Sequence, residues 1–368
     1  MSAPPQTIRV ALGERAYPIA IGAGTLANAG RFLHTVASAT HVVLITDGHV
    51  QPLYGRAVAN SLTESGATVR SISVEPGEQA KCTAVADSLW RQLLEFGADR
   101  KTIVVALGGG VIGDLAGFVA ATYARGLAFL QIPTTLLAQV DSSVGGKVGI
   151  NLPAAKNMVG AFWQPIGVLI DTDTLATLPP REYVSGLAEV VKYGVILDAE
   201  FFAELEANIA LLVERQSDVL AQVVARCCRL KADVVEADER ETGCGPPELN
   251  RAVLNYGHTF AHAIETTSGY GHWLHGEAVS IGMMCAARLA RRLGRVDDRF
   301  VGRQRELLVA LGLPVEMPDA DADTLLSAMA RDKKSEHGRL RFVLPERLGR
   351  VELVADVSAA DVRSALRP

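Results

Sequence analysis

The chain has 368 residues, of which 49% are hydrophobic and 21% charged, with 36 basic against 41 acidic side chains. An ordinary apolar fraction and a small charge imbalance exclude global disorder, and the length exceeds the roughly 250–300 residues of a single core, so we expect two domains. A formal net charge of −5 and an aromatic content of 5% exclude a general nucleic-acid binder, which needs a basic face and stacking side chains.

In the first half of the chain, short apolar runs alternate with helical patterns. Each run ends at glycine, aspartate, proline or threonine, and the expected strands are 41–46, 68–74, 102–107, 127–132 and 168–171. Short buried strands separated by helices indicate a mostly parallel sheet that is covered on both faces. The pattern therefore predicts a Rossmann-like α/β domain over residues 1–177.

After residue 178 the pattern becomes helical. Helical spacing recurs at 182–197, 199–212, 218–238, 252–267 and 276–293, and 340–344 is the one clear strand-like run. We therefore predict an all-helical second domain over residues 178–368.

A glycine run follows one expected strand and precedes a helical stretch at 111–122. Gly108, Gly109 and Gly110 would let a phosphate approach backbone N–H groups at a helix N-terminus. The spacing is not the dinucleotide fingerprint, so a plain structural turn is the alternative. Polar residues at the ends of other strands favour a dinucleotide laid across the sheet edge, namely Asp47, Glu78, Lys81, Thr134 and Thr135.

Residues 141–147 (DSSVGGK) are polar and glycine-rich, and they lead into Lys156 and Asn157. Two lysines and an asparagine so close together favour an anion-binding segment. A solvated loop is the alternative. Arg125 is a further candidate cation, although an arginine by itself is more often an ordinary surface residue.

The second half contains the sharper pattern. Arg251, Asn255, His258 and His262 are spaced i, i+4, i+7 and i+11, which predicts one face of an α-helix. A solvated face more often carries lysine and glutamate than two histidines, so we interpret this face as functional.

Two further expected helices carry groups of metal-ligand type. His275 and Glu277 begin one helix, and Glu189 and Lys192 share a face of an earlier one. One carboxylate and two imidazoles from three helices would form a Zn²⁺ site with a position open for substrate. A buried core histidine is the alternative for any single imidazole.

These motifs closely resemble the 3-dehydroquinate synthase family of the sugar-phosphate cyclase superfamily. The resemblance spans about 47–334 in the family's order and is carried by GGGVIGD at 108–114, PTT at 133–135, DSSVGGK at 141–147, KNMVGAF at 156–162, LAEVVK at 187–192, KADVV at 231–235, NYGHTF at 255–260, HGEAV at 275–279 and DKK at 332–334.

The resemblance implies a set of site residues. NAD⁺ would lie on Asp47, Glu78, Lys81, Gly109, Gly110, Val111, Asp114, Thr134, Thr135, Lys156, Thr174 and Thr177. Zn²⁺ or Co²⁺ would be bound by Glu189, His258 and His275. The anionic substrate would contact Arg125, Asp141, Lys147, Asn157, Lys192, Lys231, Arg251, Asn255, His262 and Lys334 or its neighbour Lys333. Glu241 and His262 would be acid–base residues, with Lys192 and Asn255 as further catalytic groups.

The implied reaction converts 3-deoxy-D-arabino-heptulosonate 7-phosphate to 3-dehydroquinate and phosphate. It proceeds by transient NAD-dependent oxidation, phosphate elimination, reduction and intramolecular aldol closure, within aromatic amino-acid biosynthesis. The family also implies a homodimer in which Arg125 reaches the neighbouring active site. Cyclases that make inosose or valiolone rings, a metal-dependent polyol dehydrogenase such as a glycerol dehydrogenase, and a silent dinucleotide-binding or interaction module are the alternatives.

The cysteines and the N-terminal segment predict a cytoplasmic protein. The five cysteines include an adjacent pair and no Cys-x-x-Cys pair, so we do not expect a disulfide framework. Residues 1–10 have no apolar core of a signal peptide, and no apolar run approaches the roughly 20 residues that span a bilayer.

Overall fold

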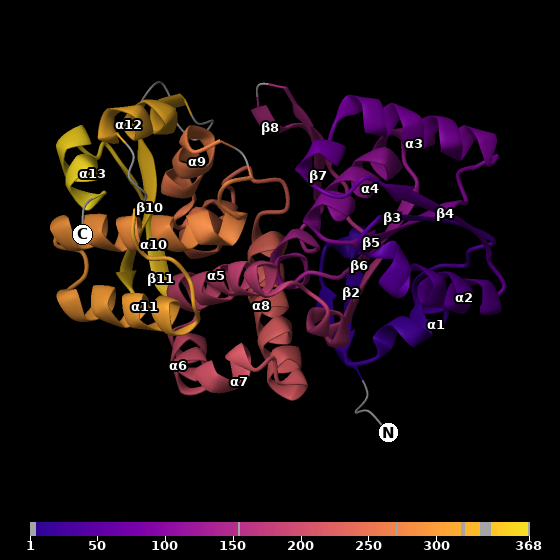
Figure 1. Cartoon of the computed structure of the whole chain (residues 1–368), viewed down its shortest axis with the longest axis horizontal. Helices are drawn as coiled ribbons and strands as arrows, with labels where there is room; N and C mark the ends of the chain where they lie inside the picture. The colour runs from indigo at the N-terminus through magenta and orange to yellow at the C-terminus, as the bar shows by residue number, and fades with distance from the viewer. Residues whose placement is uncertain (1–4, 154, 270, 318–320, 332–339, 367–368) are drawn as a thin grey trace. The chain divides into compact units, whose positions relative to one another are not determined.

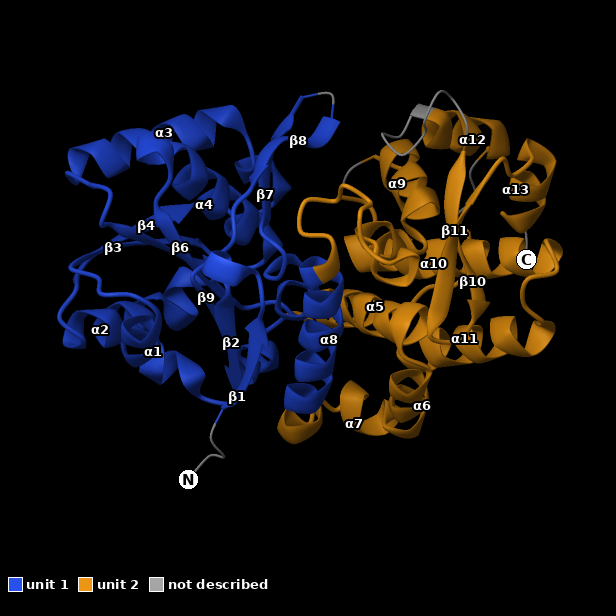
Figure 2. Cartoon of the chain, turned by 180° about the vertical axis from the view of Figure 1, so that it is seen from behind, with its two compact units in different colours: residues 1–178, 220–236 blue, residues 179–219, 237–368 orange. Residues whose placement is uncertain are grey.

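The computed structural model describes residues 5–153, 155–269, 271–317, 321–331 and 340–366. The chain divides into a first compact unit, Met1–Leu178 with Leu220–Glu236, and a second, Pro179–Val219 with Ala237–Pro368 (Figure 2). Helix α8 (Ser217–Ala237) thus belongs almost entirely to the first unit, although it follows the boundary expected at 177/178. Lys333 and Lys334, expected near the substrate phosphate, lie outside the described residues.

A seven-stranded sheet forms the centre of the first unit, in the order β1-β2-β9-β6-β5-β3-β4. Its strands are β1 (Gln6–Val10), β2 (Tyr17–Gly22), β3 (His41–Asp47), β4 (Thr68–Val74), β5 (Ile103–Gly108), β6 (Ala128–Pro133) and β9 (Gly167–Asp171). β1 pairs antiparallel with β2, and the other described pairs are parallel. The mostly parallel sheet and its five expected strands are confirmed, whereas β1 and β2 were not predicted.

Helices cover both faces of this sheet (Figure 1): α1 (Ala29–Val36) and α2 (Arg56–Glu64) on one, and α3 (Thr83–Glu95) and α4 (Gly110–Thr122) on the other. Because successive side chains of a strand point to opposite faces, β3 contributes to two cores. Val42 and Leu44 pack with residues of α1 and α2, and Val43 and Ile45 pack with residues of α3 and α4.

The glycine-rich segment after residue 141 leads into an antiparallel hairpin that we did not predict. Its strands are β7 (Lys147–Leu152) and β8 (Ala155–Phe162), with a shift of register between Ile150 and Leu152. Val148 and Ile150 are buried in the core that α4 shares with the sheet. The hairpin is therefore fixed to the sheet domain through β7, while β8 exposes Met158 and Phe162.

The second unit is mainly helical, as predicted. Its helices are α5 (Pro180–Leu197), α6 (Ala199–Ala207), α7 (Ile209–Val213), α9 (His258–Thr267), α10 (His275–Arg292), α11 (Asp298–Ala310), α12 (Ala322–Arg331) and α13 (Ala359–Ala365). A two-stranded antiparallel hairpin, β10 (Arg341–Arg347) with β11 (Arg350–Ala355), is also present. The expectation of an all-helical domain was therefore incomplete, since only the first of these strands was predicted.

The prediction of one continuous helix over 252–267 was wrong. Arg251–Asn255 form a short 3₁₀ helix, and α9 begins only at His258. Gly257 separates them with a φ of 79°, in the left-handed region that favours glycine. A Cβ atom on Gly282 of α10 would come within 2.1 Å of the Gly257 carbonyl oxygen, so α10 packs directly on this break. The four polar side chains therefore do not share one helix face.

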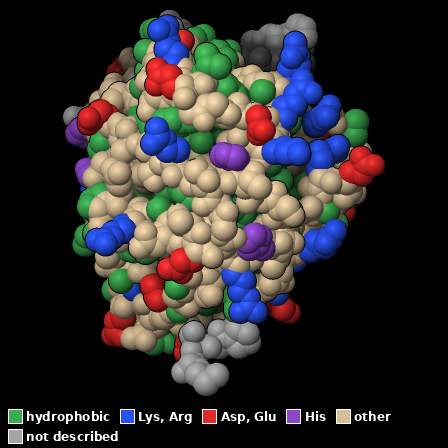
Figure 3. Space-filling model, turned by 90° about the vertical axis from the view of Figure 1, so that its right-hand side faces the viewer, with side chains coloured by type: hydrophobic (Ala, Val, Ile, Leu, Met, Phe, Trp, Pro, Cys, Tyr) green, Lys and Arg blue, Asp and Glu red, His purple; other side chains and the backbone are tan. Residues whose placement is uncertain are grey.

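In the view of Figure 3, several basic side chains gather at the upper right, whereas acidic side chains are scattered over the face. Among the helices that the structure describes, none has the length and apolarity needed to span a membrane.

Candidate metal centre and cofactor-binding elements

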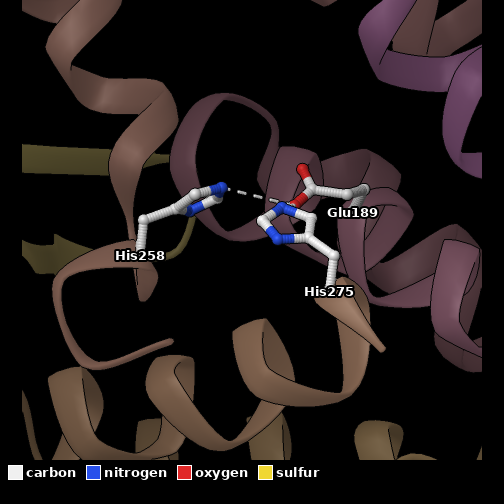
Figure 4. Close-up of side chains that lie close together, drawn as sticks. All are labelled: Glu189, His258 and His275. Atoms are coloured by element: carbon white, nitrogen blue, oxygen red, sulfur yellow. Dashed lines mark ion pairs between the residues drawn. The ribbon is translucent and has the colours of Figure 1, made fainter. Parts of the chain in front are cut away.

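Three helices of the second unit bring Glu189, His258 and His275 together (Figure 4). Glu189 lies within α5, and the two histidines are the first residues of α9 and α10. One ligand atom from each residue lies within 4.8 Å of the other two. The three helices therefore converge at these side chains.

The spacing of these three side chains fits a bound divalent ion. Glu189 Oε1 lies 3.6 Å from His258 Nε2 and 3.8 Å from His275 Nε2, beyond direct hydrogen-bonding distance. A tetrahedral site with bonds of about 2.0–2.1 Å separates its ligand atoms by about 3.4 Å. Only small adjustments would let all three atoms bind one ion.

Burial of Glu189 supports the same interpretation. Its side chain is fully buried, and Lys192 forms an ion pair with its Oε2. Oε1, which faces the imidazoles, has no hydrogen-bond partner among the described residues. A buried carboxylate oxygen without a donor is unfavourable, and a cation at this position would satisfy it.

Each imidazole is oriented by a contact at its other nitrogen. His258 Nδ1 lies 3.1 Å from the Tyr256 carbonyl oxygen, and His275 Nδ1 lies 3.6 Å from Glu265 Oε1. Such contacts to a carbonyl or carboxylate fix the tautomer that leaves Nε2 for a metal. Glu265 belongs to α9, so this helix both supplies His258 and orients His275.

The start of α10 is held against α5. Gly276 N–H donates to Ser185 Oγ at 3.0 Å, and Arg181 makes two hydrogen bonds to the carboxylate of Glu277. Glu277 Oε2 also accepts from Leu274 N–H, which caps the helix. Burial by itself would raise the pKa of Glu277, but these donors outweigh it and lower that pKa. α5 thus supplies Glu189 and the anchors that place His275.

Of the other predicted residues of the second unit, Glu241, Arg251 and Asn255 lie in the segment that leads to α9, and His262 lies within α9. Asn255 ends the 3₁₀ helix, and the ring of His262 lies 5.7 Å from that of His258, edge to face. Arg251 is buried and donates through Nη1 to the Glu239 carbonyl oxygen at 2.7 Å. Glu241 has a φ of 56°, an uncommon left-handed conformation for this residue type.

Asp238 anchors this segment. Its carboxylate accepts hydrogen bonds from the backbone N–H groups of Thr242, Gly243 and Arg251. Burial would raise the pKa of Asp238, but the backbone donors dominate and lower it. One buried carboxylate therefore fixes both ends of the segment that contains Glu241.

In the first unit, most of the residues predicted to bind a dinucleotide gather at the carboxyl ends of the parallel strands. Asp47 ends β3, and Gly109 lies between β5 and α4, which begins with Gly110 and Val111. Further members follow β4, β6 and β9, namely Glu78, Lys81, Thr134, Thr135, Thr174 and Thr177, whereas Asp114 and Lys156 lie within α4 and β8. No side chain caps the N-terminus of α4, and Gly109 is its N-cap residue. Backbone N–H groups next to glycine at a helix start are suited to a pyrophosphate.

Lys81 lies at the centre of a polar network in the same unit. Its Nζ donates to Asp114 Oδ2 at 2.7 Å and to Asn157 Oδ1 at 2.6 Å, and it lies 3.7 Å from Glu78 Oε1. Burial opposes the charge of Lys81, but the neighbouring carboxylates outweigh it and raise its pKa. Burial raises the pKa of Asp114, an effect that the Lys81 ammonium partly offsets.

Lys231 of α8 pairs with Asp141 in the first unit. Its Nζ donates to both the backbone oxygen and Oδ1 of Asp141 at 2.7 Å. Lys147 is exposed and Lys156 half-buried on the β7–β8 hairpin, while Arg125 is exposed with a φ of 68°. The structure thus groups Lys231 with Asp141 and places Arg125 at the surface.

Three residues that the sequence analysis did not single out take part in these arrangements: Asn151, Asp238 and Glu265. Glu265 follows His258 by seven positions and His262 by three, so its helical spacing was a usable signal. Asn151 and Asp238 gave no such signal, because hydrogen bonds to sequence-distant groups define them.

Models of two protein-family domains match the chain. "3-dehydroquinate synthase N-terminal" matches residues 71–185, and "3-dehydroquinate synthase C-terminal" matches residues 186–335. The 3-dehydroquinate synthase of Rhodopirellula baltica is 50% identical over 372 residues, covering 100% of this chain and 98% of that protein. The 3-dehydroquinate synthase of Geobacter metallireducens is 49% identical and covers 95% of each chain.

Solved structures of sugar-phosphate cyclases share the whole fold. A 2-deoxy-scyllo-inosose synthase complexed with carbaglucose-6-phosphate, NAD⁺ and Co²⁺ has a TM-score of 0.89 at 27% identity, covering 98% of this chain and 99% of that chain. A 2-epi-5-epi-valiolone synthase from Streptomyces hygroscopicus with NAD⁺ and Zn²⁺ bound has a TM-score of 0.87 at 30% identity, covering 97% of each. A probable glycerol dehydrogenase from Sinorhizobium meliloti is similar in fold alone, with a TM-score of 0.60 at 16% identity and 94% of each chain covered.

Proposed function

Because the chain belongs to the 3-dehydroquinate synthase family, we infer that it converts 3-deoxy-D-arabino-heptulosonate 7-phosphate to 3-dehydroquinate and phosphate. It is a phosphate-eliminating carbon–oxygen lyase of aromatic amino-acid biosynthesis, and it uses NAD⁺ with Zn²⁺ or Co²⁺. The observation that carries this conclusion is the convergence of Glu189, His258 and His275 in a chain that matches the family over its whole length.

The donor set of the second unit fits the metal. We propose Glu189, His258 and His275 as its ligands, because a buried carboxylate and two oriented imidazoles are a common zinc set. A bound ion would supply Lewis-acid chemistry at a substrate hydroxyl, and bound NAD⁺ would supply redox chemistry that leaves the cofactor unchanged after each turnover. Lys192 forms an ion pair with Glu189, and its ammonium group would be a proton donor beside the substrate oxygens.

For the cofactor we propose the residues at the strand ends of the first unit. The glycine turn before α4 would bind the pyrophosphate, and Asp47 would accept hydrogen bonds from ribose. The full proposed NAD⁺ set is Asp47, Glu78, Lys81, Gly109, Gly110, Val111, Asp114, Thr134, Thr135, Lys156, Thr174 and Thr177. We thus propose NAD binding for residues 1–177 and metal and substrate binding for 178–368, of which 220–236 lie in the first unit.

The proposed substrate contacts are mainly cationic or amide side chains, which suits a sugar acid phosphate. Arg251 and Lys231 would bind the carboxylate, and Lys147, Asn157 and His262 the phosphate. Arg125, Asp141, Lys192 and Asn255 complete the described set, and Lys334 or Lys333 lies outside the described residues. Glu241 and His262 would move protons during elimination and ring closure.

We further propose a cytoplasmic homodimer in which Arg125 completes the neighbouring active site. Arg125 is exposed, and it and Ala124 have φ values of 68° and 50°, a strained pair that points to a functional constraint. Met158 and Phe162 of the β8 edge strand are 46% and 41% exposed, which suits burial by a second copy. The cytoplasmic location rests on the cysteine pattern, an odd count with the adjacent pair Cys227 and Cys228, which does not suggest a disulfide framework.

The cationic pair argues against the cyclases that form inosose or valiolone rings, because their substrates have no carboxylate to engage Arg251 and Lys231. A polyol dehydrogenase would release NADH with each product molecule. These differences define the test.

The test measures phosphate released from 3-deoxy-D-arabino-heptulosonate 7-phosphate by the metal-loaded chain with NAD⁺. We expect release to stop when a chelator removes the metal and to return on adding Zn²⁺ or Co²⁺, without accumulation of NADH. Stoichiometric NADH, or equal release from a sugar phosphate without the carboxylate, would contradict the proposal.

A further inference from the structure

Asn151 lies outside the proposed cofactor and substrate residues, yet it joins two parts of that set in the first unit. It sits where the register of the β7–β8 hairpin shifts. Its Nδ2 donates to Glu78 Oε1 at 2.7 Å, and its Oδ1 accepts from the Asn157 N–H at 2.8 Å. Its own N–H donates to the Lys81 carbonyl oxygen at 2.7 Å.

Lys81 closes this network into a ring. Its Nζ donates to Asn157 Oδ1 at 2.6 Å, so Asn157 is held at its backbone by Asn151 and at its side chain by Lys81. Glu78 and Lys81 belong to the turn after β4, whereas Asn151 and Asn157 belong to the hairpin. The ring therefore connects a turn proposed for NAD⁺ with a strand proposed for the substrate.

The backbone of Asn157 requires such support. Its φ is 53°, in the left-handed region, where residues other than glycine are disfavoured. Asparagine tolerates this conformation better than most residues, and a fixed acceptor for its N–H would favour it further. The Asn151 side chain provides that acceptor, so it stabilises the conformation that directs Asn157.

We propose that Asn151 is a positioning residue that holds Glu78 for NAD⁺ through its amide nitrogen and Asn157 for the anionic substrate through its amide oxygen. This inference rests on the proposed function, because Glu78 and Asn157 are assigned to ligands there. The two halves of one amide thus serve two binding sites. Replacing only one half should separate their effects.

Two variants make that separation. Asn151→Ala removes both side-chain contacts. Asn151→Asp keeps an acceptor for the Asn157 N–H but removes the donor to Glu78 and places a second carboxylate beside it. Asn60→Ala, at an exposed asparagine of α2 in the same unit, is the matched control. NAD⁺ affinity is measured by titration calorimetry on the metal-loaded chain, and KM for the sugar acid phosphate at saturating NAD⁺.

We expect Asn151→Ala to weaken NAD⁺ binding and raise KM, each by about tenfold, as for the loss of one charge-assisted or buried hydrogen bond. Asn151→Asp should weaken NAD⁺ binding as much, yet keep KM within about twofold of wild type. Asn60→Ala should change neither. Partial unfolding lowers kcat without changing Kd or KM, so a merely structural role would not produce this split.

The proposal is overturned if Asn151→Asp binds NAD⁺ as wild type does, or if it raises KM as much as Asn151→Ala. Asn151→Asp by itself decides the matter if Asn151→Ala does not fold. A wild-type chain that binds no NAD⁺ would instead refute the proposed function, so the two failures are distinguishable.

Discussion

Gly276 packs against the backbone of Ser185 so closely that a Cβ atom on it would lie 1.8 Å from the Ser185 carbonyl oxygen. This contact joins α5 to α10 beside two of the proposed metal ligands, Glu189 and His275. Gly276→Ala should therefore push the helices apart, lower the free energy of unfolding by about 1–3 kcal/mol and weaken metal binding. Calorimetric unfolding and zinc titration measure both effects.

Gly302→Ala is the matched control for this substitution. Gly302 lies inside α11, and no atom lies within 4 Å of the position its Cβ would occupy. We expect this change to raise the free energy of unfolding by about 0.5–1 kcal/mol through helix propensity, with metal affinity unchanged. Equal metal affinity in both variants would contradict the role of the Ser185 contact.

Glu265 should tune the metal site without binding the ion. Its Oε1 lies 3.6 Å from His275 Nδ1. The negative charge of Glu265 orients the His275 imidazole and increases its basicity. Glu265→Gln removes this charge, so zinc affinity should fall by about 10–100-fold. Competition with a chromogenic chelator measures this change. Glu248→Gln, at an exposed glutamate of the same unit, should have no effect, and unaltered affinity in Glu265→Gln would exclude the orienting role.

The lowered pKa of Asp238 predicts a pH-dependent contribution to stability. The folded chain binds this proton more weakly than the unfolded chain, so the stabilisation is present above about pH 4 and is lost as the pH falls through the folded pKa. At neutral pH, Asp238→Asn should lower the free energy of unfolding by about 1.5–3 kcal/mol, because three backbone donors lose a charged acceptor.

Thermal unfolding of both proteins between neutral pH and about pH 3 tests this contribution. The difference in the free energy of unfolding between wild type and Asp238→Asn should become smaller as the pH falls. Asp87→Asn is the control, because it removes one partner of an exposed ion pair with Arg91. It should lower the free energy of unfolding by less than about 1 kcal/mol at any pH. A difference that stays constant with pH would show that the Asp238 charge is not responsible.

The proposed dimer predicts complementation between two inactive variants. Arg125→Ala and His275→Ala should each abolish turnover when alone. Mixed dimers would contain one intact site, with His275 from one subunit and Arg125 from the other, so refolding an equal mixture should restore about a quarter of wild-type activity. If Arg125 acts within its own subunit, the mixture will stay inactive.

The sequence indicated the central sheet well, since its strands are continuous apolar runs and β5 is buried along its whole length. The β7–β8 hairpin escaped prediction because glycine, lysine and asparagine interrupt the apolar pattern of its strands. The convergence of Glu189, His258 and His275 was foreseen through motif resemblance, but no spacing rule could give the distances between three separate helices.

Other features depended on contacts that are distant in sequence. The break at Gly257 was missed because the polar spacing through His262 continues across it, while its cause is close packing on α10. Asn151 and Glu78 are 73 positions apart, so no local pattern could link them. Local periodicity thus predicted most helices and strands. The polar networks that connect them became visible only in the three-dimensional structure.

The most direct test of the account is the metal content of His275→Ala, measured by mass spectrometry together with its release of phosphate. The account predicts a folded protein without stoichiometric Zn²⁺ or Co²⁺ and a turnover reduced at least about a thousandfold. His272→Ala, at an exposed histidine three residues earlier, should keep both metal and turnover. A His275→Ala protein that binds no metal yet retains wild-type turnover would contradict the metal-dependent mechanism.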